Sequence, residues 1–294
     1  MYAVQHVLTI TAAEAEVLKR MAQIAETKYA TGEVSQQDVL KAQAEITMLQ
    51  QRLLDMHAQE VTLKAKLNTL LNCRADAPLG RAVTAPEAQV PVDREQLFAA
   101  ATNSRSEIQG ATAQIERSRL ERELMAKEFY SDYTLGVEYR NFHEGEDMVM
   151  FTVGVELPIW RGKYGAGVRE ADQMIASSTA AREAAVQQAS FDVQDAQFKL
   201  ATARQTVDLY RQTLIPQAQL RFEASAAGYR AGKVDFMDLL ESERFLLNAR
   251  VMAAMAEGTM GMEFARLERA VGRDLKTGAP TAPPAVKGGS DRGN

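Results

Sequence analysis

The chain has 294 residues, a net charge of −5 and 46% hydrophobic residues, which suits a folded protein of one or two domains. The negative charge, without any cluster of Lys and Arg among aromatic residues, argues against nucleic acid as a partner. The single cysteine, Cys73, excludes an internal disulfide and a cysteine-based metal site within one chain. Aromatic residues make up only 6%, and Ala, Gln, Glu, Arg and Leu are abundant, a composition typical of long helices with narrow apolar seams.

The first predicted element, residues 1–76, is a hairpin of two helices that turns at Gly32. Glycine suits the left-handed residue that ends a helix, and Ser35 suits the cap of the next one. In the second helix the apolar residues recur in alternating steps of three and four, interrupted at Glu60. This is the seam of a coiled coil, formed by Val39, Ala42, Ile46, Leu49, Leu53, Met56, Leu63, Leu67 and Leu70. A linker is predicted at residues 77–93.

A helix at residues 94–130 is predicted to lead into a β-hairpin at residues 131–160, where the apolar residues begin to alternate. A run of about 9–11 alternating residues matches a transmembrane β-strand, with lipid on one face and water on the other. The positions predicted to face lipid are Tyr133, Leu135, Val137, Tyr139, Val149, Phe151, Val153, Val155 and Leu157. The alternative is a soluble hairpin that covers a helical core. Two strands do not close a barrel, so in lipid further strands must come from missing sequence or from other copies.

A second, longer helical hairpin is predicted at residues 161–275, followed by a disordered tail at residues 276–294 that is rich in Gly, Pro and charge. Its first helix has a coiled-coil seam from Val186 to Leu214. The stretch from Gly165 to Ile215 would be roughly 75 Å long at about 1.5 Å per residue. A helix of this length does not fit into a compact globule.

The turn at Gly32 recurs at Gly232, and every matched residue differs by 200 in number. The repeated residues include a tyrosine, a glycine, a valine, an aspartate and a leucine: Tyr29, Gly32, Val34, Asp38 and Leu40 match Tyr229, Gly232, Val234, Asp238 and Leu240. Asp235 takes the place of the capping Ser35. The repeat indicates two similar helical hairpins in one chain. Ordinary helix-turn-helix chemistry is the alternative reading of each turn taken alone.

Three features together resemble the TolC-like outer-membrane efflux factor family. They are the doubled Tyr-x-x-Gly-x-x-x-x-x-Asp-[Val/Leu]-Leu motif, the strand end from Val153 to Trp160, and the helix opening from Leu97 to Ile108. The resemblance covers residues 1 to about 275 and implies a mainly α fold. In that fold, long antiparallel coiled-coil helices form an α-barrel, and the β-hairpin contributes to a transmembrane β-barrel. The second repeat looks complete, whereas the first keeps only its final helical pair, so an N-terminally truncated chain is expected.

The resemblance also implies a function and partners. The chain would be the outer-membrane channel component of a tripartite efflux system in a Gram-negative cell, with helices that extend into the periplasm. It would form a homotrimer in outer-membrane lipid. A periplasmic adaptor (membrane fusion protein) and an inner-membrane pump would deliver the substrates. The expected pump belongs to the resistance-nodulation-division class, although type I secretion uses the same kind of duct. The family branch would export heavy metals or drugs.

Two groups of site residues follow from the resemblance. The tips that dock the adaptor would contain Gly32, Val34, Gly232 and Val234. An acidic ring at the tunnel mouth would contain Asp38, Asp238 and Glu241, since rings of like charge favour cations. Solvated carboxylates near the helix caps are the alternative for these three residues.

The sequence gives no reason to expect an enzyme, a cofactor or a resident metal. Of the histidines, His6 and His57 fall in helices and His143 falls in the hairpin turn, so they are expected to lie far apart. A polar turn is the favoured reading of a short segment that could attract a metal ion: His143, Glu144, Glu146, Asp147 and Met148. The alternative to a membrane duct is a soluble coiled-coil scaffold whose hairpin packs on its own helices.

Overall fold

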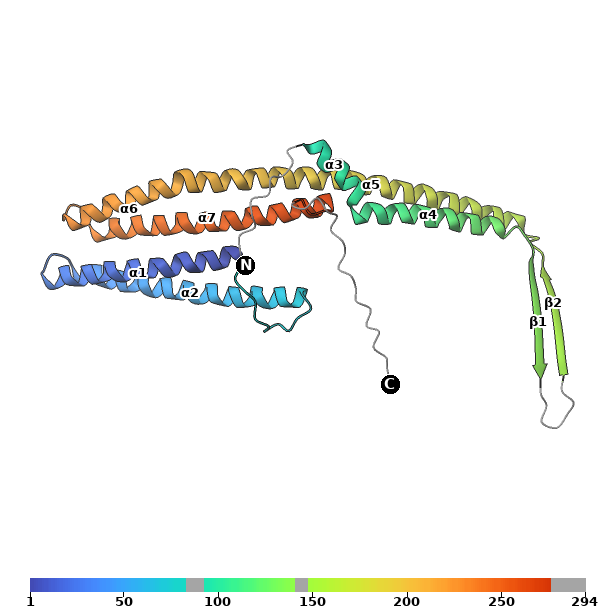
Figure 1. Ribbon diagram of the computed structural model, residues 1–294, viewed down its shortest axis with the longest axis horizontal. Helices are drawn as coiled ribbons and strands as arrows, with labels where there is room; N and C mark the ends of the chain where they lie inside the picture. The colour runs from blue at the N-terminus through green and yellow to red at the C-terminus, as the bar shows by residue number, and fades with distance from the viewer. Residues whose placement is uncertain (83–92, 141–147, 276–294) are drawn as a thin grey trace. The chain divides into compact units, whose positions relative to one another are not determined.

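The computed structural model describes residues 1–82, 93–140 and 148–275, which form long helices and one two-stranded sheet (Figure 1). The chain divides into two compact units. Unit 1 contains Met1–Val90 and Gln194–Arg269, and unit 2 contains Pro91–Val193 and Ala270–Asn294. Among the described residues, no helix is both long enough and apolar enough to cross a membrane.

Unit 1 is built from helices that pack along their lengths (Figure 1). Helix α1 (Tyr2–Ala30) and helix α2 (Gln36–Leu70) form the hairpin predicted around Gly32. Helix α6 (Ile215–Arg230) and helix α7 (Phe236–Val271) form a second hairpin around Gly232.

The core of unit 1 draws apolar side chains from all four of these helices. It contains Val7, Leu18, Met21, Ala22, Ala25, Val39, Ala42, Leu49, Tyr229, Phe236, Leu239, Leu240, Leu247, Val251 and Ala254. Many of these residues are alanines, which let helix backbones approach closely. At Gly258 the approach is closer still, because an added Cβ would lie 2.6 Å from the Cβ of Ala3. The predicted seam of α2 is thus confirmed near Gly32, whereas its far end is exposed at Leu70.

The long helix predicted to Ile215 continues beyond it. Helix α5 (Arg161–Leu209) passes through a π-helical turn at Tyr210–Leu214 and runs on into α6. Pro216 explains the turn, since proline lacks an N–H and its ring conflicts with the carbonyl four residues earlier. In the wider turn the N–H of Ile215 donates to the carbonyl of Tyr210.

In unit 2 the helix predicted at residues 94–130 is divided at Arg105. Helix α3 (Arg94–Ser104) ends and helix α4 (Ser106–Lys127) begins on either side of this residue, whose ψ of 122° is extended. The guanidinium of Arg105 donates to Asp192 of α5 at 2.6 Å and to Glu107 at 3.3 Å. These contacts hold the break in place, and sequence periodicity alone gave no sign of it.

Gly272 packs directly against this break. Its φ is +76°, and an added Cβ would lie 2.9 Å from the Cα of Arg105. We expect Gly272→Ala to lower the free energy of unfolding by about 2 kcal/mol, because both the left-handed conformation and the backbone contact oppose a side chain. Denaturant titration followed by helical circular dichroism measures this change.

Gly261 provides the matched control for Gly272→Ala. It lies inside α7, and nothing lies within 4 Å of an added Cβ. Gly261→Ala should therefore stabilise the helix by about 0.5–1 kcal/mol. Equal effects of the two substitutions would show that the contact between Gly272 and Arg105 is not tight in solution.

The β-hairpin consists of strands β1 (Asp132–Arg140) and β2 (Met148–Glu156), paired antiparallel. The register places Leu135 opposite Val153, and Val137 opposite Phe151. Directly opposed residues share one face of a sheet, so the predicted apolar positions within the strands do lie on a single face. Leu157 directly follows β2.

Some predicted segments fall outside the described residues. The tail at residues 276–294 lies there entirely, and so does most of the linker at residues 77–93. The same holds for His143, Glu144, Glu146 and Asp147 of the segment considered for metal attraction.

Candidate functional site

The two turns of unit 1 have the same backbone geometry. Gly32 and Gly232 have φ values of +77° and +71°. In the first turn, the N–H of Glu33 donates to the carbonyl of Lys28 at 2.8 Å; in the second, Lys233 donates to Gly228 at 2.9 Å. A left-handed glycine, followed by a residue whose N–H donates to the carbonyl five residues earlier, is the Schellman motif that ends a helix. The repeat predicted from the sequence is therefore confirmed at the level of local geometry.

The caps after the turns differ. Ser35 occupies the N-cap position of α2, but its side chain makes no capping hydrogen bond. Asp235 does cap α7, because its carboxylate accepts from the N–H of Asp238 at 2.8 Å. The prediction of a capping side chain thus holds for Asp235 and is wrong for Ser35.

The two turns together line one groove of about 680 Å³ at the end of unit 1, which we call the tip groove. Its lining comes from both turns: Lys28, Glu33, Val34, Ser35, Asp38, Tyr229, Gly232, Lys233, Val234, Asp235 and Phe236. The structure thus brings together four of the predicted site residues, Val34, Asp38, Gly232 and Val234. Gly32 lies in the first turn beside this lining, whereas Asp238 and Glu241 do not contribute to it.

Lys28 joins the two turns. Its Nζ donates to the carbonyl of Tyr229 at 3.2 Å, lies 3.5 Å from the carboxylate of Glu33 and stands 4.8 Å from the centre of the Tyr229 ring. The ring of Tyr229 in turn packs edge-on against Phe236 at 5.6 Å. Sequence reasoning missed Lys28. The residue at the matching position of the second turn is Gly228, and this difference between the two repeats was the one sequence signal that could have pointed to Lys28.

We expect Lys28→Met to lower the free energy of unfolding of unit 1 by about 1–2 kcal/mol. The substitution removes a charged hydrogen bond and a cation–π contact from a position where the side chain is only 19% exposed. Lys19→Met is the control, since Lys19 pairs with Glu16 on the exposed surface of α1, and such pairs contribute about 0–1 kcal/mol. Urea titration of both variants checks the difference, and equal losses would contradict the bridging role of Lys28.

The predicted acidic residues have three different environments. Asp38 is half-buried and close enough to Tyr229 to act on its phenol: burial first, then the charges of Asp38 and Glu33, raise the pKa of Tyr229. Asp238 is exposed. Glu241 is exposed too and accepts from Arg221 of α6 at 3.0 Å. Asp38 lies in the first turn of α2, and Asp238 and Glu241 lie near the start of α7.

The apolar face of the hairpin is uncovered. Its nine residues are between 53% and 81% exposed: Tyr133, Leu135, Val137, Tyr139, Val149, Phe151, Val153, Val155 and Leu157. At the base of the hairpin Tyr130, Ile159 and Trp160 are also more than 70% exposed. Patches of this kind mark contact with a membrane or with another protein.

The opposite face of the hairpin has mostly small and polar residues, together with Met148 and Met150. Thr134 faces Gly154 and Gly136 faces Thr152 across the strands, and Glu138 forms an ion pair with Arg140 at 2.6 Å. The two faces of the sheet therefore differ in chemistry as the alternation predicted, except at Met148 and Met150, which add apolar surface to the second face.

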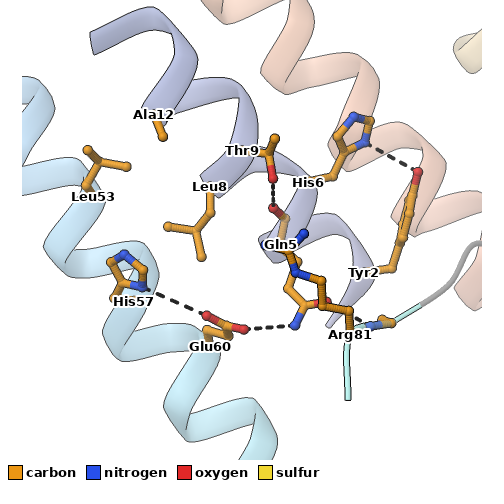
Figure 2. A pocket seen from close by; sticks show the side chains of 11 residues that line it. Tyr2, Gln5, His6, Leu8, Thr9, Ala12, Leu53, His57, Glu60 and Arg81 are labelled. Carbon is orange, nitrogen blue, oxygen red and sulfur yellow. Dashed lines mark hydrogen bonds and ion pairs between the residues drawn. The ribbon is translucent and has the colours of Figure 1, made fainter. Parts of the chain in front are cut away.

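A second cavity of unit 1, about 500 Å³ in volume, lies between α1 and α2 (Figure 2). His6 and His57 both line it, so the expectation that they lie far apart is wrong. His57 approaches Glu60 at 3.9 Å, and Gln5 donates to Glu60 at 2.8 Å (Figure 2). Hydrogen bonds from Lys64 and then Gln5 lower the pKa of Glu60. The carboxylate that interrupts the predicted seam is thus satisfied by polar partners.

These cavity residues do not make a metal centre. Within residues 1–82, 93–140 and 148–275, no three or more His, Cys, Asp or Glu side chains are grouped so that they could hold a metal ion. The described site features are therefore surfaces for contact: the tip groove and the apolar face of the hairpin.

The chain is similar to a known protein family and to a curated protein. The model of the family described as outer membrane efflux protein matches residues 97–273. The cobalt-zinc-cadmium resistance protein CzcC of Cupriavidus metallidurans is 24% identical over 284 residues, which cover 92% of this chain. The chain spans 64% of the length of that relative.

Solved structures show the same fold. The outer membrane protein VceC of Vibrio cholerae aligns with a TM-score of 0.75 at 18% identity, over 93% of this chain and 67% of VceC. The channel protein CusC aligns with a TM-score of 0.78 at 17% identity, over 93% of this chain and 66% of CusC. Since the family model matches more than half of its residues, the chain belongs to the outer membrane efflux protein family.

Proposed function

We propose that this chain is the outer-membrane channel component of a tripartite efflux system, a passive exit duct without chemistry of its own. The observation that carries the proposal is the exposed apolar face of the hairpin, opposite a face of mainly small and polar residues. Lipid on one side and a water-filled pore on the other account for both faces. Family membership supports the same reading.

A soluble scaffold accounts for the hairpin less well. In that alternative the nine apolar residues would pack on the chain's own helices, but each of them is more than half exposed within the described structure. Leaving them in water would cost about 25 cal/mol for every Å² of apolar surface. A lipid environment removes this cost.

Other copies of the chain would contribute further strands to the barrel. The two strands pair only with each other within the described residues, so each has one edge of unpaired backbone groups. Such edges are not tolerated in hydrocarbon, where no water can satisfy them. We therefore propose a homotrimer in outer-membrane lipid of a Gram-negative cell, with the helices of unit 1 in the periplasm.

The tip groove is the proposed docking site for a periplasmic adaptor. Gly32, Val34, Gly232 and Val234 belong to its two turns, and both valines are half-buried, so part of each side chain remains available for contact. An inner-membrane pump of the resistance-nodulation-division class would drive export through the adaptor.

For Asp38, Asp238 and Glu241 we propose a ring of carboxylates at the tunnel mouth, repeated in each protomer. The exposure of Asp238 supports this role. The ion pair between Glu241 and Arg221 favours an ordinary solvated carboxylate at that position. Because the curated relative is named for cobalt, zinc and cadmium resistance, heavy-metal cations are the proposed cargo, and carboxylate rings suit cations.

The proposed functional segments follow the predicted division of the chain. They are the helical hairpin of the first repeat, a linker, the opening helices of the second repeat, the transmembrane hairpin, the long helical hairpin and the tail: residues 1–76, 77–93, 94–130, 131–160, 161–275 and 276–294.

Membrane fractionation tests the proposal. The full chain is produced in a Gram-negative host, and inner membrane, outer membrane and soluble fractions are separated on a density gradient. We expect the chain in the outer-membrane fraction, released by detergent but not by high salt. A chain that stays soluble without detergent would overturn the duct and favour the scaffold.

A further inference from the structure

Two carboxyl groups are buried against each other where α1 packs on α7. Glu14 of α1 is 2% exposed and Glu243 of α7 is 3% exposed, and their carboxyl groups lie close enough for a hydrogen bond. A hydrogen bond between two carboxyl groups requires a proton on one of them, since two carboxylates only accept. The contact therefore depends on protonation.

The charged groups around this pair come from α2 and α7, and α6 adds a neutral amide. Arg250 of α7 donates to Glu14 at 3.2 Å and to Gln219 of α6 at 3.0 Å. A cavity of about 310 Å³ borders Glu243 and is lined from α2 by Glu45 and Arg52 and from α7 by Arg244. Arg244 forms an ion pair with Glu45.

Two of these arginines already have an acidic partner, and within the described part of the chain Arg52 forms no ion pair with Glu243. Arg250 balances the carboxylate of Glu14, and Arg244 and Glu45 balance each other. A second carboxylate at Glu243 would face that of Glu14 at low dielectric, and like charges in contact oppose ionisation. Burial first, then Glu14, raises the pKa of Glu243 to about 8 despite the nearby charge of Arg250.

We propose that a proton held between the buried carboxyl groups of Glu14 and Glu243 is a latch between α1 and α7, and that losing this proton loosens the packing of the two helices. The inference stands on the contacts in unit 1 and does not depend on the export function. Because α1 and α7 lead directly into the two turns of the tip groove, the latch would also link the mobility of the tips to pH.

The internal repeat indicates that this pair is specific to the α1–α7 contact. The positions that match Glu14, Glu243 and Arg250 are Leu214, Gln43 and Gln50. None of these three residues carries a charge. The latch therefore belongs to the contact between the two hairpins and is not a general feature of their common pattern.

The sign of the pH effect follows from the two protonation states. In the unfolded chain a glutamate titrates near 4.5, whereas native Glu243 keeps its proton up to about pH 8. Between these values the native state binds more protons than the unfolded state. The stabilisation from this proton is therefore complete below the pKa of the unfolded chain, 4.5. It is lost as pH rises through the pKa of native Glu243, about 8. The unfolding equilibrium constant should rise about tenfold per pH unit in this interval.

Glu243→Gln is the decisive variant, because the amide keeps a donor for Glu14 but does not titrate. We measure urea unfolding of the full chain in detergent at several values between about pH 5.5 and 8. The wild-type unfolding constant should rise about tenfold per pH unit relative to that of Glu243→Gln. Parallel pH profiles of the two proteins would overturn the latch.

Glu16→Gln is the matched control. Glu16 lies two residues from Glu14 on α1, with its side chain 64% exposed, and a hydrogen bond from Lys19 lowers its pKa. Its titration therefore lies below the tested range, and the pH profile of this variant should follow that of wild type. If Glu16→Gln flattened the pH dependence of the unfolding constant as Glu243→Gln does, net charge would explain the effect, and the proposed latch would be contradicted.

A second measurement needs no variant. Infrared difference spectra of the wild-type chain should contain the carbonyl band of a protonated buried carboxyl at neutral pH, and this band should disappear as pH rises past about 8. Amide hydrogen exchange in α1 and α7, corrected for its intrinsic pH dependence, should accelerate over the same range. The absence of a protonated band at neutral pH would contradict the proposal.

Discussion

Replacing Phe236 with alanine is expected to lower the free energy of unfolding of unit 1 by about 3–5 kcal/mol, the range for a large aromatic residue lost from a packed core. Phe236 is 1% exposed and begins α7 directly after the turn at Gly232. Its ring meets Tyr229 edge-on at 5.6 Å, so alanine removes this aromatic contact and leaves a cavity. Urea titration at one fixed pH, followed by helical circular dichroism, measures the loss.

The internal repeat supplies the matched control for Phe236→Ala. Gln36 occupies the same place after the turn at Gly32, but its side chain is exposed. Gln36→Ala should change the free energy of unfolding by no more than about 0.5 kcal/mol, since alanine suits a helix and no packing is lost. If both substitutions cost the same, the aromatic contact would not be what stabilises the second turn.

This contrast shows which part of the fold could be predicted from the sequence. The turns could be predicted, because a left-handed glycine and its hydrogen bonds are local features, and the structure has them at Gly32 and at Gly232. Burial could not. Leu40 is 55% exposed whereas its counterpart Leu240 is 2% exposed, and Tyr29 and Tyr229 differ in the same direction, at 47% and 4%. Burial depends on which helices pack around a residue, and two motifs with matching residues do not specify those neighbouring helices.

The same reasoning applies to the candidate site. The two faces of the hairpin follow from alternation along each strand, so the sequence predicted them correctly. Lys28, Glu14 and Glu243 acquire their roles from residues more than 200 positions away in the chain. Their environment depends on how α1 lies against α6 and α7, and helical periodicity within one segment does not contain that register. The break at Arg105 likewise depends on Asp192, a distant partner.

Placing an arginine on the apolar face of the hairpin is expected to block membrane insertion. Phe151 is 75% exposed and lies opposite Val137 near the middle of the paired strands. If this face meets lipid, Phe151→Arg should cost about 2–4 kcal/mol at the midplane of the bilayer, which reduces the equilibrium constant for insertion roughly 30- to 1000-fold. Density-gradient fractionation of the full chain measures the inserted fraction.

Thr152→Arg is the control that makes the result specific, because it adds the same charge one residue further along, on the opposite face. Thr152 lies across from Gly136, so an arginine side chain there has room. In the proposed duct this side chain points into water and should leave insertion nearly unchanged. The proposed lipid contact predicts a large difference between the two variants.

A hairpin packed on protein would lose folding with Phe151→Arg even in detergent, whereas a lipid-facing one would keep its helical content there and fail only to insert. Equal insertion of Phe151→Arg and Thr152→Arg would mean that the apolar face does not meet hydrocarbon, and the export function proposed for this chain would then lose its main physical support.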